Sequence, residues 1–210
     1  MKCQYYMKLG IVSLSALLLA SCDLTGAIDQ TVGHEDASQQ PEAVLDSAEA
    51  NLNSEQVTVD SVVDGDTVRI INQLGEKETV RMLLIDTPES VHPTEPEPPY
   101  GKAASDYLAS IISQGDTITL ERGEVPTDKY DRTLGYLFIE SENGPVNINQ
   151  LMIEQGYARV AYVYEPNTKY LDDFETAEMK AGDAGLNIWQ HRGYVSNQGF
   201  DPSFVDVDEE

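Results

Sequence analysis

The stretch VRMLLIDTPES, residues 80–90, joins an apolar run to a polar turn. A buried strand explains the apolar residues 83–85, and a turn explains the proline that follows them. Neither explains why one arginine, Arg81, and two carboxylates, Asp86 and Glu89, frame the run. The stretch is therefore either a strand and a turn or one wall of an active site.

The chain is strongly acidic. Its 210 residues include 13 lysines and arginines against 37 aspartates and glutamates, which gives a formal net charge of -24. This length suits one domain with flanking segments. No cysteine follows Cys22, so an internal disulfide and a cysteine-based zinc site are excluded for the segment after it. The histidines lie far apart without metal-ligand spacing and are expected to be solvated: His34, His92 and His191.

The first residues have the features of a processing signal. Two lysines precede an apolar run over 9–20, which fits the ~7–15 residues of a signal sequence and falls short of the ~20 of a spanning helix. The run ends in LASC (19–22), which resembles a bacterial lipobox. We therefore predict a lipoprotein signal peptide over 1–21 and a lipid anchor on Cys22. The protein would then sit outside the cytoplasm on the bacterial cell membrane; the alternative is a plain secretory signal with a chance cysteine.

Composition divides the remaining chain into three segments. Residues 22–56 are rich in Asp, Glu, Gln, Ser and Ala and lack aromatic residues, which predicts a disordered acidic tether. Residues 57–200 form the predicted domain, and 201–210 form an acidic tail. The acidic excess within the domain has two interpretations, a solvated surface or repulsion of nucleic acid.

Periodicity within the domain predicts its fold. Strands are expected at 57–63, 66–71, 78–85, 116–121 and 134–140, with a hairpin turn at Asp64-Gly65. Helices are expected at about 100–113, 148–155 and 169–182, the second of them capped by Asn147, and an extended apolar stretch at 158–164. The pattern favours an α+β fold, a five-stranded OB-fold β-barrel with three α-helices.

Four charged residues lie at the ends of these strands or beyond them, and a fifth, Arg81, lies inside the third strand. Alone, each has a simple structural explanation: a turn former, a capped turn or a surface arginine. Together, Asp66, Asp86 and a backbone carbonyl suit a hard cation such as Ca2+. The guanidinium groups of Arg81 and Arg132 match phosphate oxygens, and Glu89 can take a proton from water. These are the parts needed to hydrolyse a phosphodiester.

Seven stretches, in order, resemble the staphylococcal nuclease, or thermonuclease, family. They are DGDTV (64–68), VRMLLIDTPE (80–89), HP (92–93), YGKAAS (100–105), TDKYDR (127–132), GYARVAYVYEPN (156–167) and LNIW (186–189). The resemblance covers about 57–190. It implies an OB-barrel with three helices and a Ca2+-dependent nuclease that hydrolyses DNA and RNA to 3'-phosphorylated products.

The resemblance also implies which residues bind the metal and activate water. Asp66 and Asp86 would bind Ca2+ through their carboxylates, and Thr87 through its backbone carbonyl. Glu89 would act as the general base, or at least position the attacking water.

Further roles concern the substrate. The resemblance implies that Arg81 and Arg132 clamp the phosphate and stabilise the transition state, and that Arg132 assists the leaving oxygen. The residues implied to line the nucleotide pocket are Lys129, Tyr130, Tyr162 and Tyr164. Bases stack on aromatic faces without sequence preference, although core packing is an alternative for the last two tyrosines.

Three features depart from the family pattern. Asp131 stands where the family usually has glycine; Asp tolerates a positive φ better than most residues, but its charge lies beside Arg132. Glu95 and Glu97 stand where the family tends to have lysines. The segment 123–127 has an extra residue.

Three functional hypotheses follow. The first is a monomeric Ca2+-dependent nuclease acting on DNA and RNA and anchored to the membrane through Cys22. The second is a non-catalytic OB module that binds nucleic acid or another ligand. The third, an acidic calcium-binding surface lipoprotein, leaves both arginines unexplained. The presence of all five charged residues favours the enzyme.

Overall fold

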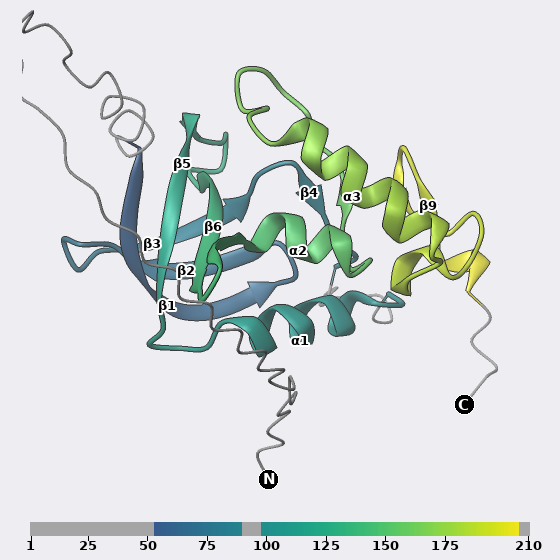
Figure 1. Cartoon of the computed structure of the whole chain (residues 1–210), viewed down its shortest axis with the longest axis horizontal. Coiled ribbons are helices and arrows are strands. Elements are labelled where there is room, and N and C mark those ends of the chain that lie inside the picture. The colour runs from purple at the N-terminus through teal and green to yellow at the C-terminus, as the bar shows by residue number, and fades with distance from the viewer. Residues whose placement is uncertain (1–52, 90–97, 206–210) are drawn as a thin grey trace, which may run out of the picture. The chain divides into compact units, whose positions relative to one another are not determined.

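The computed structural model describes residues 53–89 and 98–205 (Figure 1). Contacts divide the chain into one unit over 1–41 and a second over 42–210, and every described residue belongs to the second. The signal peptide, Cys22, nearly all of the tether, the loop with Glu95 and Glu97, and half of the tail lie outside the described residues. These assignments and the domain bounds remain predictions.

The strands close into a barrel. Its sheet has the order β3-β2-β1-β5-β6-β7, and a further parallel pairing of β3 with β6 joins the two sides. The strands are β1 (Ser54–Asp64), β2 (Thr67–Ile71), β3 (Lys77–Met82), β5 (Thr117–Thr127), β6 (Thr133–Ser141) and β7 (Gly144–Asn147). The strands β1, β2, β3, β5 and β6 therefore form a mixed five-stranded barrel, which confirms the predicted fold class.

Alternating residues of these strands fill the barrel. In β2 and β3, for example, Val68, Ile70, Val80 and Met82 are buried while the residues between them face outward. Burying a side chain of this size contributes about 1.5–3 kcal/mol. The alternation that predicted the strands is thus the same alternation that builds the core.

Three helices surround the barrel, and the second and third of them pack against each other (Figure 1). They are α1 (Gly101–Ile111), α2 (Ile148–Glu154) and α3 (Leu171–Asp183). Helix α1 contacts β1, whereas α2 contacts β6 and α3. The Asn147 side chain caps α2 by accepting a hydrogen bond from the Gln150 backbone N–H at 3.2 Å, as predicted. All three helices lie within two residues of their predicted bounds.

The stretch 80–90 corrects the prediction of one continuous strand over 78–85. Strand β3 ends at Met82, and Leu84 adopts a positive φ of 63°. A separate strand β4 (Ile85–Asp86) then pairs with β8 (Arg159–Val160). The apolar run hides the break because the residues on both sides of it, Met82 to Ile85, are all buried.

Tertiary hydrogen bonds hold this break in place. The buried Asn149 side chain donates to the Leu83 carbonyl at 3.0 Å and accepts from the Leu137 N–H at 3.1 Å. The Ala161 N–H donates to the Leu84 carbonyl at 3.0 Å. Since backbone groups that leave the barrel ladder are still paired, the strained Leu84 is tolerated.

Smaller elements were not predicted or were shorter than predicted. The first hairpin turn is Gly65-Asp66, one residue later than expected. Only β8 is regular within the expected extended stretch 158–164. The C-terminal part adds β9 (Val195–Ser196), β10 (Gly199–Phe200) and the 3-10 helices η2 (Asn187–Trp189) and η3 (Pro202–Phe204). Within 53–89 and 98–205, no helix is long and apolar enough to cross a membrane.

Candidate active site

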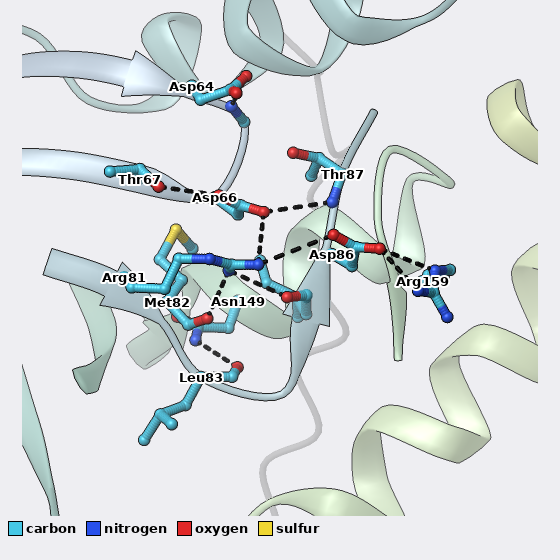
Figure 2. A network of polar contacts seen from close by, with 12 residues as sticks. Asp64, Asp66, Thr67, Arg81, Met82, Leu83, Asp86, Thr87, Asn149 and Arg159 are labelled. Atoms are coloured by element: carbon cyan, nitrogen blue, oxygen red, sulfur yellow. Dashed lines mark hydrogen bonds and ion pairs between the residues drawn. The ribbon is translucent and has the colours of Figure 1, made fainter. Parts of the chain in front are cut away.

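The ends of three strands bring the predicted site residues together. Asp66 lies in the β1–β2 turn, Arg81 is on β3 opposite Thr67, and Asp86 ends β4. The Met82 N–H donates to the Asp66 carbonyl at 2.9 Å, which fixes the turn against β3. Figure 2 shows these side chains converging between the strands.

Arg81 is the centre of this cluster. Its Nη2 lies 2.9 Å from Asp66 Oδ2 and 3.8 Å from Asp86 Oδ1. Its Nη1 donates to the carbonyls of Met82 and Ile85, each at 3.0 Å. The break after β3 turns these carbonyls toward the guanidinium, so the unusual backbone of residues 83–85 also positions the arginine.

The Asp66 carboxylate is buried and held on both oxygens. Thr67 Oγ1 donates to Oδ1 at 2.9 Å, and the Thr87 N–H donates to Oδ2 at 3.3 Å. Burial nevertheless raises the pKa of Asp66, and the charges of Asp64 and Asp86 add to the rise, while Arg81 and the Thr67 hydrogen bond oppose it. Burial is therefore the main influence on this carboxylate, and the nearby negative charges act in the same direction.

The donor set fits a hard divalent cation. Asp66 Oδ2 and Asp86 Oδ1 converge because both lie within 3.8 Å of the same Arg81 nitrogen. Thr87 Oγ1 is buried beside them without a hydrogen-bond partner. Oxygen ligands of this kind suit Ca2+. The described residues hold no group of three His, Cys, Asp or Glu arranged for a metal, so backbone oxygens and water would complete the coordination.

Gly65 allows this close packing. A Cβ at this position would lie 2.8 Å from Thr87 Oγ1 and 2.8 Å from the Ala104 Cβ. The glycine of the first turn is thus required by the approach of β4 and α1.

Glu89 lies at the exposed edge of the cluster. Partial burial, a hydrogen bond with Asp64 and the charges of Asp64 and Asp66 raise the pKa of Glu89 to about 7, against the opposing effect of Arg81. A carboxylate with a pKa in this range is well matched to proton transfer at neutral pH. Asp64, which the sequence did not single out, thus acts on the predicted base.

Arg132 forms a second group. Its Nε and Nη2 bind Asp128 Oδ2 at 2.8 and 2.7 Å, and its guanidinium lies 5.5 Å from the centre of the Tyr130 ring. Lys129 Nζ lies 4.8 Å from the centre of the same Tyr130 ring. Among the described residues no hydrogen bond or ion pair joins Arg132 to the Arg81 cluster. Arg132 directly precedes Thr133, the first residue of β6, and Thr133 pairs with Val80 of β3. Arg81 and Arg132 therefore lie on, or directly before, two neighbouring strands.

Asp128 organises the loop that carries Arg132. Its Oδ1 accepts hydrogen bonds from the backbone N–H groups of Tyr130 and Arg132, each at 2.9 Å. Asp131 has a φ of 61°, which explains why the family usually has glycine there. The spacing of Asp128 and Arg132, four residues apart, was the one available signal for this pairing.

The predicted nucleotide-pocket tyrosines are exposed. Tyr162 is 56% exposed and Tyr164 72%, so core packing does not account for either side chain. The Tyr162 ring lies 5.3 Å from the Arg81 guanidinium. Within 53–89 and 98–205, no contact joins the Tyr164 side chain to either arginine.

Arg159 is a site residue that the sequence did not indicate. It binds Asp86 Oδ2 through Nε at 2.9 Å and Nη2 at 2.7 Å. Arg159 and Asp86 are 73 positions apart in the sequence. No local sequence pattern therefore marks Arg159 as a partner of Asp86.

Comparisons with known proteins identify the family of the chain. A family model described as staphylococcal nuclease homologue matches residues 79–191. Endonuclease YncB of Bacillus subtilis (strain 168) is 41% identical over 145 residues, which cover 69% of this chain and 66% of that protein. The SPbeta prophage-derived endonuclease YokF of the same strain is also 41% identical over 69% of this chain, but the match covers 47% of that protein. The thermonuclease of Staphylococcus intermedius is 39% identical over 67% of this chain and 79% of its own length. The chain thus spans about two thirds of the length of endonuclease YncB and about half of the length of endonuclease YokF.

Proposed function

The chain belongs to the staphylococcal nuclease family, and we propose that it is a Ca2+-dependent nuclease that hydrolyses phosphodiester bonds of DNA and RNA. The observation that carries this proposal is the cluster in which Asp66 and Asp86 converge on Arg81, with Glu89 at its edge. The relatives' names, endonuclease and thermonuclease, support the same reaction class.

Asp66 and Asp86 would hold Ca2+ with their carboxylates, and Thr87 with its backbone carbonyl. The bound cation would polarise the phosphoryl group and lower the energy of the charge that develops on it. Within the chain, Thr67 and the Thr87 N–H orient Asp66, and Arg159 orients Asp86.

Glu89 accepts the proton of the attacking water, or orients that water. Its raised pKa favours proton transfer near neutral pH. Its hydrogen bond with Asp64 and its charge interactions with Asp66 and Arg81 support this role.

Arg81 and Arg132 stabilise the charge on the phosphate oxygens. Arg81 keeps Nη1 on two backbone carbonyls, so Nη2 is the nitrogen available to phosphate once the carboxylates have another cation partner. Arg132 must exchange Asp128 for the substrate. Charge-assisted, forked hydrogen bonds to phosphate make this exchange favourable at the transition state.

Exposed aromatic rings complete the substrate site. Tyr130 and Tyr162 each face one of the two arginines, and Lys129 adds a charge beside the first ring. Tyr164 extends the exposed aromatic surface by one more ring. Bases can stack on such faces irrespective of sequence.

The finer features of the function are part of the same proposal. The products carry a 3'-phosphate, and the protein acts as a monomer. A lipid on Cys22 anchors it to the bacterial cell membrane, where the acidic segment 22–56 spaces the domain from the lipid. The lipobox-like LASC and the composition of that segment support the anchor and the tether.

The test is digestion of single-stranded DNA by a soluble chain that begins at residue 42, ahead of β1. We expect cleavage with Ca2+, none with EDTA, and a loss of about 10²- to 10³-fold in kcat for Arg132→Ala. The matched control Arg69→Ala changes an exposed arginine of β2 and should cleave like the wild type. DNA binding without Ca2+-dependent cleavage would instead support a non-catalytic OB module.

A further inference from the structure

Asp86 has a second cationic partner on the side away from Arg81. Strand β8 pairs with β4 so that Arg159 lies directly opposite Asp86. Nε and Nη2 of Arg159 both bind Oδ2, at 2.9 and 2.7 Å. The two side chains are only 12% and 14% exposed, so water competes little for this pair.

The two arginines use different oxygens of Asp86. Arg159 takes Oδ2, whereas Oδ1 points to Arg81 at 3.8 Å. Figure 2 shows the two guanidinium groups on opposite sides of the carboxylate. A forked donor on one oxygen fixes the rotation of the carboxylate and leaves the other oxygen to the site.

Arg159 is itself fixed by two other parts of the fold. The Val160 N–H donates to Glu178 Oε1 of α3 at 2.7 Å, which anchors β8. The guanidinium of Arg159 lies 5.6 Å from the centre of the Phe200 ring. Phe200 belongs to the β9–β10 hairpin and packs 5.6 Å from the fully buried Tyr194 ring.

This hairpin lies outside the part of the chain that matches the family model, which ends at residue 191. The contact from Phe200 through Arg159 to Asp86 therefore connects a segment beyond the matched region to a residue of the proposed metal site. Cation–π contacts of partly desolvated arginines are strong enough to bias one side-chain conformation.

We propose that Arg159 is a positioning residue that orients Asp86 for divalent-cation binding, and that Phe200 of the β9–β10 hairpin holds Arg159 in place. This inference rests on the proposed function of the same site. The positive charge of Arg159 would by itself weaken cation binding, whereas its orientation of Asp86 would strengthen it. The two effects on the affinity for the cation are therefore opposite. Substitutions that separate the two effects therefore test the inference.

The test is calorimetric titration of the chain from residue 42 with Ca2+ alone. Arg159→Lys keeps the charge but loses the fork, and we expect the Kd for Ca2+ to rise about tenfold, as for other residues that orient metal ligands. Arg159→Gln should not bind more tightly than the wild type. The control Arg122→Lys changes another arginine paired with carboxylates, Glu55 and Glu78, and should leave the Kd unchanged.

Different results would overturn different claims. Wild-type affinity in Arg159→Lys, together with tighter binding by Arg159→Gln, would show that Arg159 acts only by its charge and would overturn the inference alone. No Ca2+ binding by the folded wild type would overturn the calcium part of the proposed function as well. Thermal unfolding in EDTA confirms that each variant is folded before its Kd is compared.

A second pair of variants tests the hairpin. Phe200→Leu should raise the Kd about two- to fivefold because Arg159 loses its aromatic contact. Phe204→Leu makes the same change in a half-exposed ring of the same segment that does not contact Arg159, and should not alter the Kd. Equal affinities of Phe200→Leu and the wild type would overturn the role of the hairpin.

Discussion

At the scale of single residues, the negative charge of Asp131 beside Arg132 is the feature most open to test. Asp131 occupies a left-handed conformation that glycine or asparagine adopts more easily. Arg132 already has Asp128 as an ion-pair partner. A second carboxylate nearby opposes the approach of phosphate without adding a needed contact.

We expect Asp131→Asn to lower KM about two- to fivefold at low salt with little change in kcat. Asparagine tolerates the same φ, so the substitution removes charge and leaves the backbone as it is. Steady-state cleavage of a short single-stranded DNA measures both constants. Asp116→Asn, a change of the same kind in another loop, serves as control, and an unchanged KM in Asp131→Asn would contradict this account.

The sequence indicated part of the neighbourhood of Arg81, because Asp66 and Asp86 lie beside a visible turn and strand end and the family resemblance added Thr87. The structure brings these residues and Arg81 together, while their roles stay predictions. Arg159 was missed because its partner is remote in sequence and the surrounding stretch shows only apolar periodicity.

At the scale of elements, the break between β3 and β4 decides where Asp86 lies. Sequence periodicity predicted one strand because all residues from Met82 to Ile85 are buried. The break depends on Asn149, whose side chain binds backbone groups of two other segments. Such tertiary hydrogen bonds leave no pattern in the local sequence. The helices, by contrast, are visible in the sequence through their capping residues and apolar faces.

Asn149→Ala should destabilise the fold by roughly 2–4 kcal/mol, because it leaves the Leu137 N–H and the Leu83 carbonyl buried without partners. Urea unfolding measures the free energy of unfolding. The exposed Asn143 provides the control, since Asn143→Ala removes no side-chain hydrogen bond of this kind. A change below about 0.5 kcal/mol in Asn149→Ala would show that the break does not depend on this side chain.

A charged network ties four barrel strands together. Arg122 of β5 binds Glu55 of β1 and Glu78 of β3, and Glu78 accepts a hydrogen bond from Thr133 of β6 at 2.6 Å. The hydrogen bond from Arg122 and those from Thr133 and Asn72 lower the pKa of Glu78 to about 2 from 4.5, against the effect of burial. The ionised carboxylate therefore stabilises the folded state.

This shift predicts a pH dependence of stability. A depressed folded-state pKa gives stability that is fully present above pH 4.5 and is lost as pH falls from 4.5 toward 2. Glu78→Gln should cost about 1–2 kcal/mol at pH 7, after allowance for solvent screening, and the difference should shrink between pH 4.5 and 2. Thermal unfolding across this range measures it, with the exposed Glu142→Gln as control. If the difference in unfolding free energy between the wild type and Glu78→Gln stayed constant with pH, the lowered pKa of Glu78 would not be its cause.

At the scale of the whole molecule, the net charge of -24 opposes long-range attraction of nucleic acid. Under the proposed function, phosphate contacts would then be limited to the proposed metal site and the two arginines. The composition made this conflict visible, but it could not show where the two arginines lie. The structure places Arg81 on β3 and Arg132 directly before β6, the strand that pairs with β3.

We expect a shallow salt dependence of cleavage. If two arginines make the phosphate contacts, log kcat/KM should fall against log salt concentration with a slope no steeper than about -2. Measurements with one oligonucleotide from low to moderate NaCl at constant Ca2+ give this slope. A slope of about -5 or steeper would mean that other basic residues bind the phosphates.

The central claim is that the cluster around Arg81 hydrolyses phosphodiesters with Glu89 activating water. Its most direct test is the kcat for single-stranded DNA of Glu89→Gln in saturating Ca2+, beside the wild type and the exposed control Glu142→Gln. We predict a loss of about 10²- to 10⁴-fold in kcat for Glu89→Gln alone, with a fold as stable as that of the wild type. Wild-type turnover by Glu89→Gln would contradict the claim.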